Sequence, residues 1–301
     1  MAYRNLMITN PARLSVKQRQ LMIVTDTERS VPIEDILTIM LENQQITITG
    51  AALSQLAEAG VLIYVCDSQH LPSAVFTPVY QHSRRLSVLE SQLAVSKPYQ
   101  KQLWQQIVCQ KIANQAKCLE LCGKEAQPLY NMVREVRSGD TTNVEAAAAS
   151  YYFITLFGQG FIRRDGQLIN GALNYGYSLL RGLVARALAV YGFEPSLGLH
   201  HHNALNAFNL ADDLLEPFRP LVDLYVAEQA DFWAEDVYTL SPAHKQGLYR
   251  LLSMTMLSGG ECHAVYYAVE RIVKSLSTCI TQGQGTLLLP ELLPLTVHSY
   301  E

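Results

Sequence analysis

Residues suited to metal chemistry are concentrated in one segment, 198–220, which reads GLHHHNALNAFNLADDLLEPFRP. Three consecutive histidines come first, and three carboxylates follow at Asp212, Asp213 and Glu216. On a helix, Asp212 and Asp213 come four and three residues before Glu216, so all three carboxylates fall near one face within a single turn. Like charges at that distance repel one another, and proteins offset the repulsion with a bound cation or with arginine partners. The segment therefore favours a metal site.

Each half of the segment also has an ordinary structural explanation. Carboxylates at a helix N-terminus offset the macrodipole, which would account for Asp212. A histidine run can form a solvated loop, and Arg219, three residues after Glu216, can neutralise the acidic cluster. The spacing matches no standard zinc template. The joint occurrence of histidine and acids within residues 201–216 favours a metal site over these alternatives.

A further candidate is Glu145, which opens an alanine-rich helix directly after the turn-rich stretch SGDTTN at 138–143. Asn143 is the expected N-cap, which places Glu145 in the first helical turn. One interpretation is a glutamate that only offsets the helix dipole. The other starts from the alanines at 146–149, whose flat face lets a second helix approach closely. A carboxylate at the end of that face would point into the junction, as metal ligands do in helical proteins.

The elements that must position these residues divide into two parts. In the first part, apolar residues alternate with polar ones on both sides of residues 17–20, which predicts a hairpin. Thr49 is the expected cap of a helix that Gly60 ends. We expect a small β-rich N-terminal domain over residues 1–78. Its expected strands cover 3–8, 14–16, 21–23, 31–41, 46–48, 61–65 and 71–75.

From residue 82 onward the apolar residues recur at helical spacing. The Leu/Pro-rich tail at 288–298 is expected to be irregular. We therefore expect an α+β protein, in which a larger all-α C-terminal domain over 79–301 follows the β-rich one. The expected helices cover 86–93, 103–122, 129–133, 146–157, 173–188, 212–216, 221–233, 249–256 and 261–279.

The composition excludes several classes of protein. The chain has 301 residues, of which 49% are hydrophobic, so it can form a packed core and is not a disordered chain. Its net charge of −4 argues against a basic protein that coats nucleic acid. DNA binding would need a local basic surface, a metal or a basic partner. Neither a CxxC pair nor a P-loop occurs, which argues against a zinc ribbon and ATP-driven chemistry.

The sequence also bears on the compartment in which the chain works. No apolar stretch reaches membrane-spanning length, and the apolar run at 61–65 is only strand-sized. The first residues have neither a long apolar core nor a small-residue cleavage site, so no signal peptide is expected. We therefore expect a cytoplasmic protein.

Several motifs, taken in order, resemble one known family. They are Glu145 with the four alanines after it and Tyr152-Phe153, LNYGYSLLR at 173–181, GLHHHN at 198–203 and FNLADDLLEPFRP at 208–220. With IEDILTIMLENQQITITGAALSQLAEAGV at 33–61, they resemble the CRISPR-associated endonuclease/integrase of spacer acquisition, the "Cas-one" family. The last motif is similar to the branch found in type II systems, which accompanies the large dual-RNA-guided effector nuclease.

The resemblance implies a metal site made of a glutamate, a histidine and a further acid. Its glutamate position falls on Glu145, its histidine on His201, and its last acid on Glu216, where many members have aspartate. His200 is the alternative to His201 within the histidine run, and Asp213 matches another acidic position of the site. The implied cofactor is Mg²⁺ or Mn²⁺, and the histidine favours Mn²⁺ slightly.

The resemblance also implies a reaction and a set of partners. The 3′-hydroxyl of a short DNA duplex attacks a phosphodiester at the edge of a CRISPR repeat, and the fragment is inserted as a new spacer. The family forms homodimers, with residues 1–78 as the expected dimerisation domain. Two dimers flank a small ferredoxin-like partner dimer in a hetero-hexamer. In type II systems a ring-forming adaptation protein and the effector nuclease join them.

Two other functions stay open at this point. A metal-dependent nuclease would use the same site with water, in place of a DNA hydroxyl, as the nucleophile. A catalytically idle DNA-binding or scaffolding relative would not need the site at all. The presence of Glu145, His201 and Glu216 together argues against the idle relative.

Overall fold

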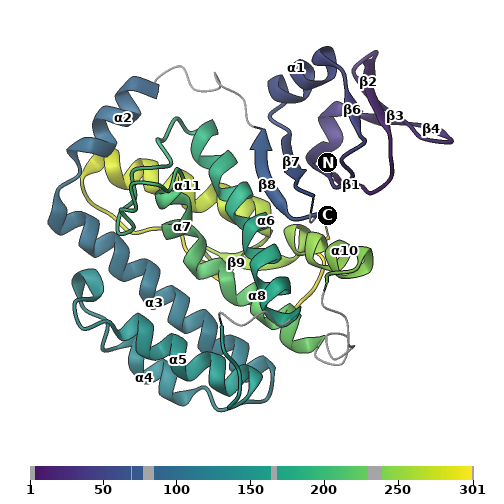
Figure 1. Cartoon of the computed structure of the whole chain (residues 1–301). Helices are drawn as coiled ribbons and strands as arrows, with labels where there is room; N and C mark the ends of the chain where they lie inside the picture. The colour runs from purple at the N-terminus through teal and green to yellow at the C-terminus, as the bar shows by residue number, and fades with distance from the viewer. Residues whose placement is uncertain (1–3, 69, 77–84, 164–167, 230–238, 300–301) are drawn as a thin grey trace. The chain divides into compact units, whose positions relative to one another are not determined.

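The computed structural model divides the chain into two compact units (Figure 1). One unit comprises Met1–Ser83 with Ser299–Glu301, and the other comprises Arg84–His298. The residues that the structure describes are 4–68, 70–76, 85–163, 168–229 and 239–299. The expected domain boundary at residue 78 falls within 77–84, which lies outside the described residues.

Two four-stranded sheets form most of the N-terminal unit, together with helix α1 (Gly50–Glu58). The strands are β1 (Arg4–Ile8), β2 (Arg13–Lys17), β3 (Gln20–Val24), β4 (Glu28–Pro32), β5 (Ile36–Leu41), β6 (Thr47–Ile48), β7 (Leu62–Cys66) and β8 (Pro72–Phe76). One sheet has the order β1-β5-β7-β8, with β1, β5 and β7 parallel, and the other has the order β4-β3-β2-β6. Strand β5 is buried along almost its whole length, as is typical of a central parallel strand.

The interior of the N-terminal unit is built from the alternation seen in the sequence. The predicted hairpin is β2 with β3, and its residues Leu14 and Leu21 are fully buried beside Leu56 of α1. The Thr49 side chain accepts a hydrogen bond from the backbone N–H of Ala52 at 3.2 Å. Thr49 therefore caps α1, as the sequence predicted.

Helices dominate the C-terminal unit. They are α2 (Arg85–Ala94), α3 (Lys97–Leu121), α4 (Gln127–Val133), α5 (Val144–Phe157), α6 (Leu168–Val190), α7 (Asn209–Leu215), α8 (Arg219–Glu228), α10 (Pro242–Arg250) and α11 (Val265–Gln282). Helices α4 and α5 pack along α3, and α8 and the turn Glu216–Phe218 contact it as well (Figure 1). The buried side of α3 carries polar residues among apolar ones, namely Lys111, Asn114 and Gln115. This helix therefore brings polar groups into the interior of the unit.

A three-stranded sheet interrupts the helices of the C-terminal unit and corrects the expected secondary structure. Its order is β10-β9-β11, from β9 (Thr255–Ser258), β10 (Glu261–Ala264) and β11 (Pro290–Glu291). The expected helices over 249–256 and 261–279 are wrong at these strands. Gly259 and Gly260 both have positive φ angles, 62° and 82°, so they form the tight turn between β9 and β10.

The tail also differs from its expected irregular form, because β11 pairs with β9 and Met254 bridges to Val297. The α+β class is nevertheless confirmed, with a β-rich N-terminal unit and a mostly helical C-terminal one.

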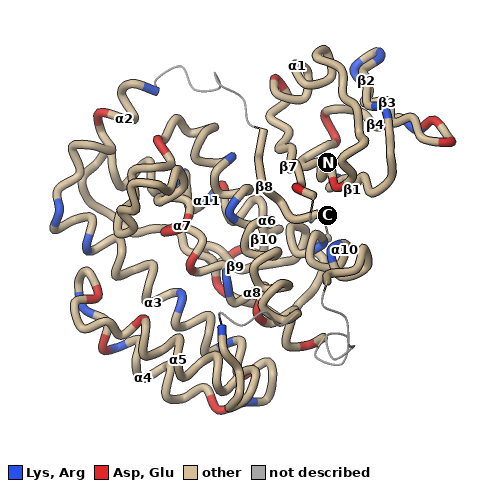
Figure 2. The backbone as a smooth tube through the Cα atoms, in the orientation of Figure 1, with Lys and Arg blue, Asp and Glu red and all other residues tan. Residues whose placement is uncertain are grey.

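Basic and acidic residues are interspersed along the elements of the chain (Figure 2). In the described part of the chain, no helix combines the length and the apolar character that a membrane span requires.

Candidate functional site

A buried ammonium group lies at the centre of the candidate site. Lys111 of α3 places its Nζ 2.5 Å from Glu145 Oε1 and 2.5 Å from Glu216 Oε2. The Lys111 side chain is 10% exposed, and that of Glu216 is 6% exposed. Burial alone would lower the pKa of Lys111, but attraction to Glu216 and Glu145 raises it. Two of the three predicted ligands thus converge on one cation.

Glu145 is held by the start of α5, although not by the predicted cap. The Asn143 side chain makes no capping hydrogen bond, and its backbone is left-handed with a φ of 55°. Asp140 takes over the role, since its carboxylate accepts from the N–H groups of Val144 at 2.9 Å and Glu145 at 3.0 Å. The predicted cap is therefore wrong by three residues, because the turn folds Asp140 back onto the helix end. Of the alanines at 146–149, Ala148 is fully buried but Ala146 and Ala147 are exposed, so the expected inward-packing face is only partly present.

Glu216 begins the turn between α7 and α8. Its Oε1 accepts from Arg219 Nε at 2.9 Å, so Arg219 neutralises this one member of the acidic cluster. Burial opposes ionisation of Glu216, but the charges of Arg219 and Lys111 outweigh it and lower the pKa of this carboxyl to about 2. Asn114 of α3 ties the turn down, since its Nδ2 donates to the Pro217 carbonyl at 2.7 Å. The carboxylate is thus ionised at neutral pH, and its turn is tied to α3.

The histidine loop is organised by Asp213, which is fully buried in α7. Its carboxylate accepts from the backbone N–H groups of Leu199 at 2.6 Å, His200 at 3.0 Å and His201 at 3.2 Å. The same carboxylate accepts from His201 Nδ1 at 2.6 Å. Gly198 allows this close approach, because a Cβ there would lie 2.3 Å from the His201 carbonyl oxygen.

The two candidate histidines have different surroundings. His200 stacks flat on Trp104, with ring centroids 4.2 Å apart. The Nδ1 of His201 is bonded to Asp213, and among the described residues its Nε2 has no partner. The hydrogen bond to Asp213 is the main reason why the pKa of His201 is raised, and the charge of Glu216 adds to it. His201 is therefore the histidine that has an unpartnered nitrogen and that lies close enough to Glu216 to feel its charge.

The three clustered carboxylates do not share one partner. Asp212 pairs with Arg181 Nε at 2.8 Å and also accepts from Asn206. Asp213 binds the histidine loop, and Glu216 binds Lys111 and Arg219. Within the described residues, no three His, Cys, Asp or Glu side chains are already gathered to hold a metal ion. The position between Glu145 and Glu216 is taken by the ammonium group of Lys111.

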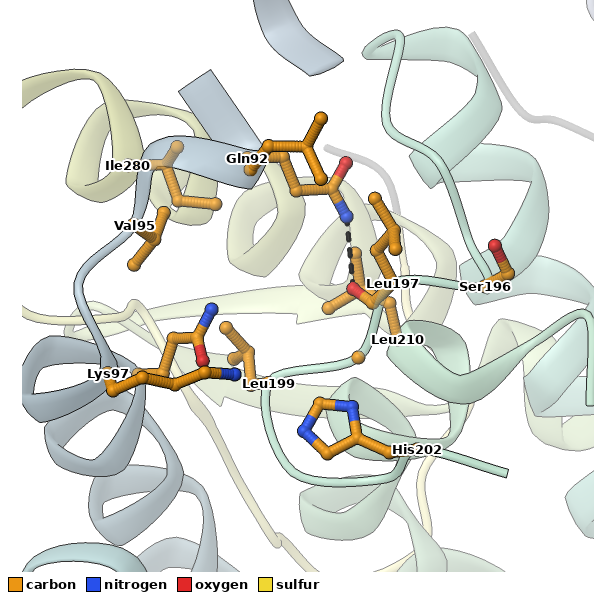
Figure 3. A pocket seen from close by; sticks show the side chains of 12 residues that line it. Gln92, Val95, Lys97, Ser196, Leu197, Leu199, His202, Leu210 and Ile280 are labelled. Atoms are coloured by element: carbon orange, nitrogen blue, oxygen red, sulfur yellow. Dashed lines mark hydrogen bonds between the residues drawn. The ribbon is translucent and has the colours of Figure 1, made fainter. Parts of the chain in front are cut away.

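Two cavities adjoin these residues. The first measures about 150 Å³ and is lined by Lys111, Gln115, Glu216 and Arg219, among others. The second measures about 280 Å³ and flanks the histidine loop. His202 and Gln92 line it, and Gln92 Nε2 donates to the Leu197 carbonyl at 3.0 Å (Figure 3).

Several residues of the site have no motif in the sequence. Lys111 is one, and no pattern singles it out, because Asn114 and Gln115 are further polar residues on the buried side of α3. Asp223 is another, fully buried with Tyr152 Oη at 2.9 Å and Tyr177 as a second donor. Burial raises the pKa of Asp223 to about 6, although both tyrosine hydrogen bonds oppose the rise. Arg163 lies over the Tyr177 ring and lines the smaller cavity.

Comparisons with known proteins address the family. The model of the family described as CRISPR associated protein Cas1 matches residues 6–231. The CRISPR-associated endonuclease Cas1 of Neisseria meningitidis serogroup C is 44% identical over 308 residues, covering 100% of both chains. A second relative, from Pyrobaculum aerophilum and named CRISPR-associated endonuclease Cas1 2, is 28% identical and covers 73% of this chain and 80% of its own.

Solved structures share the fold. A casposase bound to integration product superposes with a TM-score of 0.77 at 19% identity, covering 95% of this chain and 92% of that one. A Cas1 protein from Thermotoga maritima gives a TM-score of 0.74 at 16% identity, with coverages of 94% and 99%. The family match and the full-length relative confirm the resemblance read from the sequence motifs. The chain belongs to the Cas1 family of CRISPR-associated proteins.

Proposed function

We propose that this chain is a metal-dependent integrase of CRISPR adaptation. The 3′-hydroxyl of a short DNA duplex attacks a phosphodiester at the edge of a CRISPR repeat. One phosphodiester bond forms as another breaks, so the reaction needs no energy from ATP hydrolysis. The observation that carries the proposal is the convergence of Glu145 and Glu216 on one cation, beside a histidine whose Nε2 is free.

The side chains of the site suit Mg²⁺ or Mn²⁺. Glu145, Glu216 and His201 would hold the ion, and two carboxylates with one imidazole match the preferences of these metals. The ammonium of Lys111 already shows that the space between the carboxylates accepts a positive charge. When bound, the ion supplies Lewis-acid stabilisation of the charge that develops on the phosphoryl oxygens.

Other side chains of the chain prepare these three. The Asp213 carboxylate accepts a hydrogen bond from Nδ1–H of His201, so in the neutral imidazole Nε2 carries the free lone pair. Arg219 keeps Glu216 ionised and holds its Oε1, so that Oε2 faces the cation. Asp140 orients Glu145 through the first turn of α5. These contacts reduce the reorganisation that the site needs before reaction.

The proposed partners follow from the family. The chain would act as a homodimer through the region 1–78, on a prespacer duplex and the CRISPR repeat. The casposase of the solved neighbour is bound to an integration product, and another neighbour is a Cas6-RT-Cas1–Cas2 complex. By analogy, two dimers would flank a small ferredoxin-like partner dimer. The motif at 208–220 further suggests the type II branch, with its ring-forming adaptation protein and effector nuclease.

A second candidate activity is hydrolysis without strand transfer. It is favoured by the name of the full-length relative, a CRISPR-associated endonuclease. The same residues would serve, with water as the nucleophile. The two activities differ in whether the cleaved strand becomes covalently joined to a second DNA.

The test is a strand-transfer assay. A supercoiled plasmid with a repeat array is incubated with the chain, the small partner protein, Mn²⁺ and a short duplex labelled at its end. We expect label to become covalently attached to the plasmid, and Glu145→Ala to prevent it. Nicking without transfer of label would favour hydrolysis, and neither product in the presence of the partner would overturn the proposal.

A further inference from the structure

The contacts of Lys111 raise a question about how a metal ion could enter the site. Its ammonium lies within 2.5 Å of both Glu145 Oε1 and Glu216 Oε2. These contacts occupy the oxygens that a divalent ion would need. An ammonium and a divalent ion repel strongly at such a distance, and they cannot both sit between the same two oxygens. Binding of a metal ion therefore requires the ammonium to move.

A buried ammonium that loses its carboxylates needs another acceptor, because an unpaired charge in the interior is very costly. Gln115 supplies one. It lies one helical turn after Lys111 on α3, so the two side chains project from the same face. Gln115 is 2% exposed, and its buried Oε1 has no hydrogen-bond partner within the described residues. Unpartnered buried acceptors are uncommon and require an explanation.

The space for such a movement is present. The cavity of about 150 Å³ beside Glu216 is lined by both Lys111 and Gln115. Asp223 lines the same cavity and adds a carboxylate to it, although its oxygens already accept from Tyr152 and Tyr177. A displaced ammonium would thus exchange two carboxylates for a neutral acceptor, in a cavity that Asp223 and the cations Arg163 and Arg219 also line.

We propose that Lys111 is a resident counter-cation, which a divalent ion displaces from Glu145 and Glu216 towards Gln115. Without metal, Lys111 holds the two carboxylates together against their mutual repulsion. With metal, Gln115 receives the ammonium. The pair Lys111–Gln115 therefore sets the metal affinity of the site. Lys111 and Gln115 are positioning residues in this scheme, and the inference depends on the proposed metal-dependent function.

The test measures Mn²⁺ binding by isothermal titration calorimetry on the full chain, without DNA. Lys111→Met removes the competing cation, so we expect Mn²⁺ to bind about tenfold more tightly, within the range of ordinary coupling between ligands. Gln115→Leu removes the acceptor for the displaced ammonium, so we expect binding about fivefold weaker. In the double variant the Gln115→Leu change should have no further effect, because no ammonium remains to be received.

Melting temperatures in EDTA separate this role from a purely structural one. Without metal, Lys111→Met should melt at a lower temperature than the wild type, because Glu145 and Glu216 then repel each other. Addition of Mn²⁺ should restore the melting temperature. Gln115→Leu should fold as the wild type does, so it tests the inference even if Lys111→Met does not fold. Absence of Mn²⁺ binding by the wild type would overturn the proposed metal-dependent function. Binding by the wild type, with Gln115→Leu equal or tighter, would overturn this inference alone.

Discussion

Asp213→Asn is the substitution that most sharply tests how the histidine loop is held. The Asp213 carboxylate accepts four hydrogen bonds, three from backbone N–H groups and one from His201 Nδ1, and they are divided evenly between its two oxygens. Asparagine has the same shape but only one acceptor oxygen. Two of the four donors would therefore face an NH₂ group and lose their partner.

The expected cost follows from that count. Hydrogen bonds to a charged group contribute about 1.5–3 kcal/mol each, so losing two should destabilise the loop and its helix by roughly 3–6 kcal/mol. This is a large fraction of the roughly 5–15 kcal/mol by which proteins are stable. The same change should lower the pKa of His201, because the hydrogen bond to Asp213 is the main cause of its rise.

Hydrogen exchange provides the assay. In Asp213→Asn, the backbone amides of Leu199, His200 and His201 should exchange at least about a hundredfold faster than in the wild type, as expected for a loss of roughly 3 kcal/mol. Asp212→Asn is the matched control, because Asp212 pairs with a partly exposed Arg181. The Asp212 carboxylate accepts from Arg181 and Asn206, whereas the three amides donate to Asp213, so they should keep their protection. Unchanged exchange in Asp213→Asn would refute the organising role of this carboxylate.

The remaining predictions concern activity and pH. Single alanine substitutions at Glu145, His201 and Glu216 should each lower strand transfer more than about 100-fold with the fold retained by circular dichroism, whereas His202→Ala should stay within about threefold. Full transfer by any of the first three variants would remove that residue from the proposed ligand set. Because the pKa of Asp223 is raised from 3.8 to about 6, its ionisation should destabilise the fold by about 1.4 kcal/mol per pH unit across that interval. Urea unfolding at pH 4 and pH 7 should show this loss in the wild type and a weaker pH dependence in Asp223→Asn; identical pH dependence would contradict it.

The parts of the fold that depend on local sequence could be predicted. The hairpin of β2 and β3 follows from alternating apolar residues on both sides of a polar turn, and Thr49 has the residue type and position of a helix cap. The sheet of the C-terminal unit was missed although Gly259-Gly260 is a hairpin signal between two short strand-like runs. The flanking residues have apolar side chains at helical spacing, which predicts helix in place of strand. In addition, β9 pairs with β11, which lies about thirty residues later in the chain, and a local pattern does not predict such a pairing.

The acids and the histidine of the candidate site could be proposed from sequence motifs, whereas the groups that support them could not. Asp213 looked like a member of an acidic cluster, and its contacts with the histidine loop depend on how that loop folds back. The capping role of Asp140 depends on the left-handed turn at Gly139 and Asp140, which no helix-start rule anticipates. Lys111 was missed because a lysine in a helix is ordinarily solvated, and only packing shows that it is buried between two carboxylates.

The central claim is that Glu145, His201 and Glu216 bind one divalent cation in place of the Lys111 ammonium. Anomalous diffraction at the manganese absorption edge, from crystals of the full chain grown with Mn²⁺, tests it most directly. The account predicts a single strong anomalous peak within coordination distance of both carboxylates and of His201 Nε2, with the Lys111 ammonium moved towards Gln115. A peak elsewhere, or Lys111 still between the two carboxylates at saturating Mn²⁺, would contradict it.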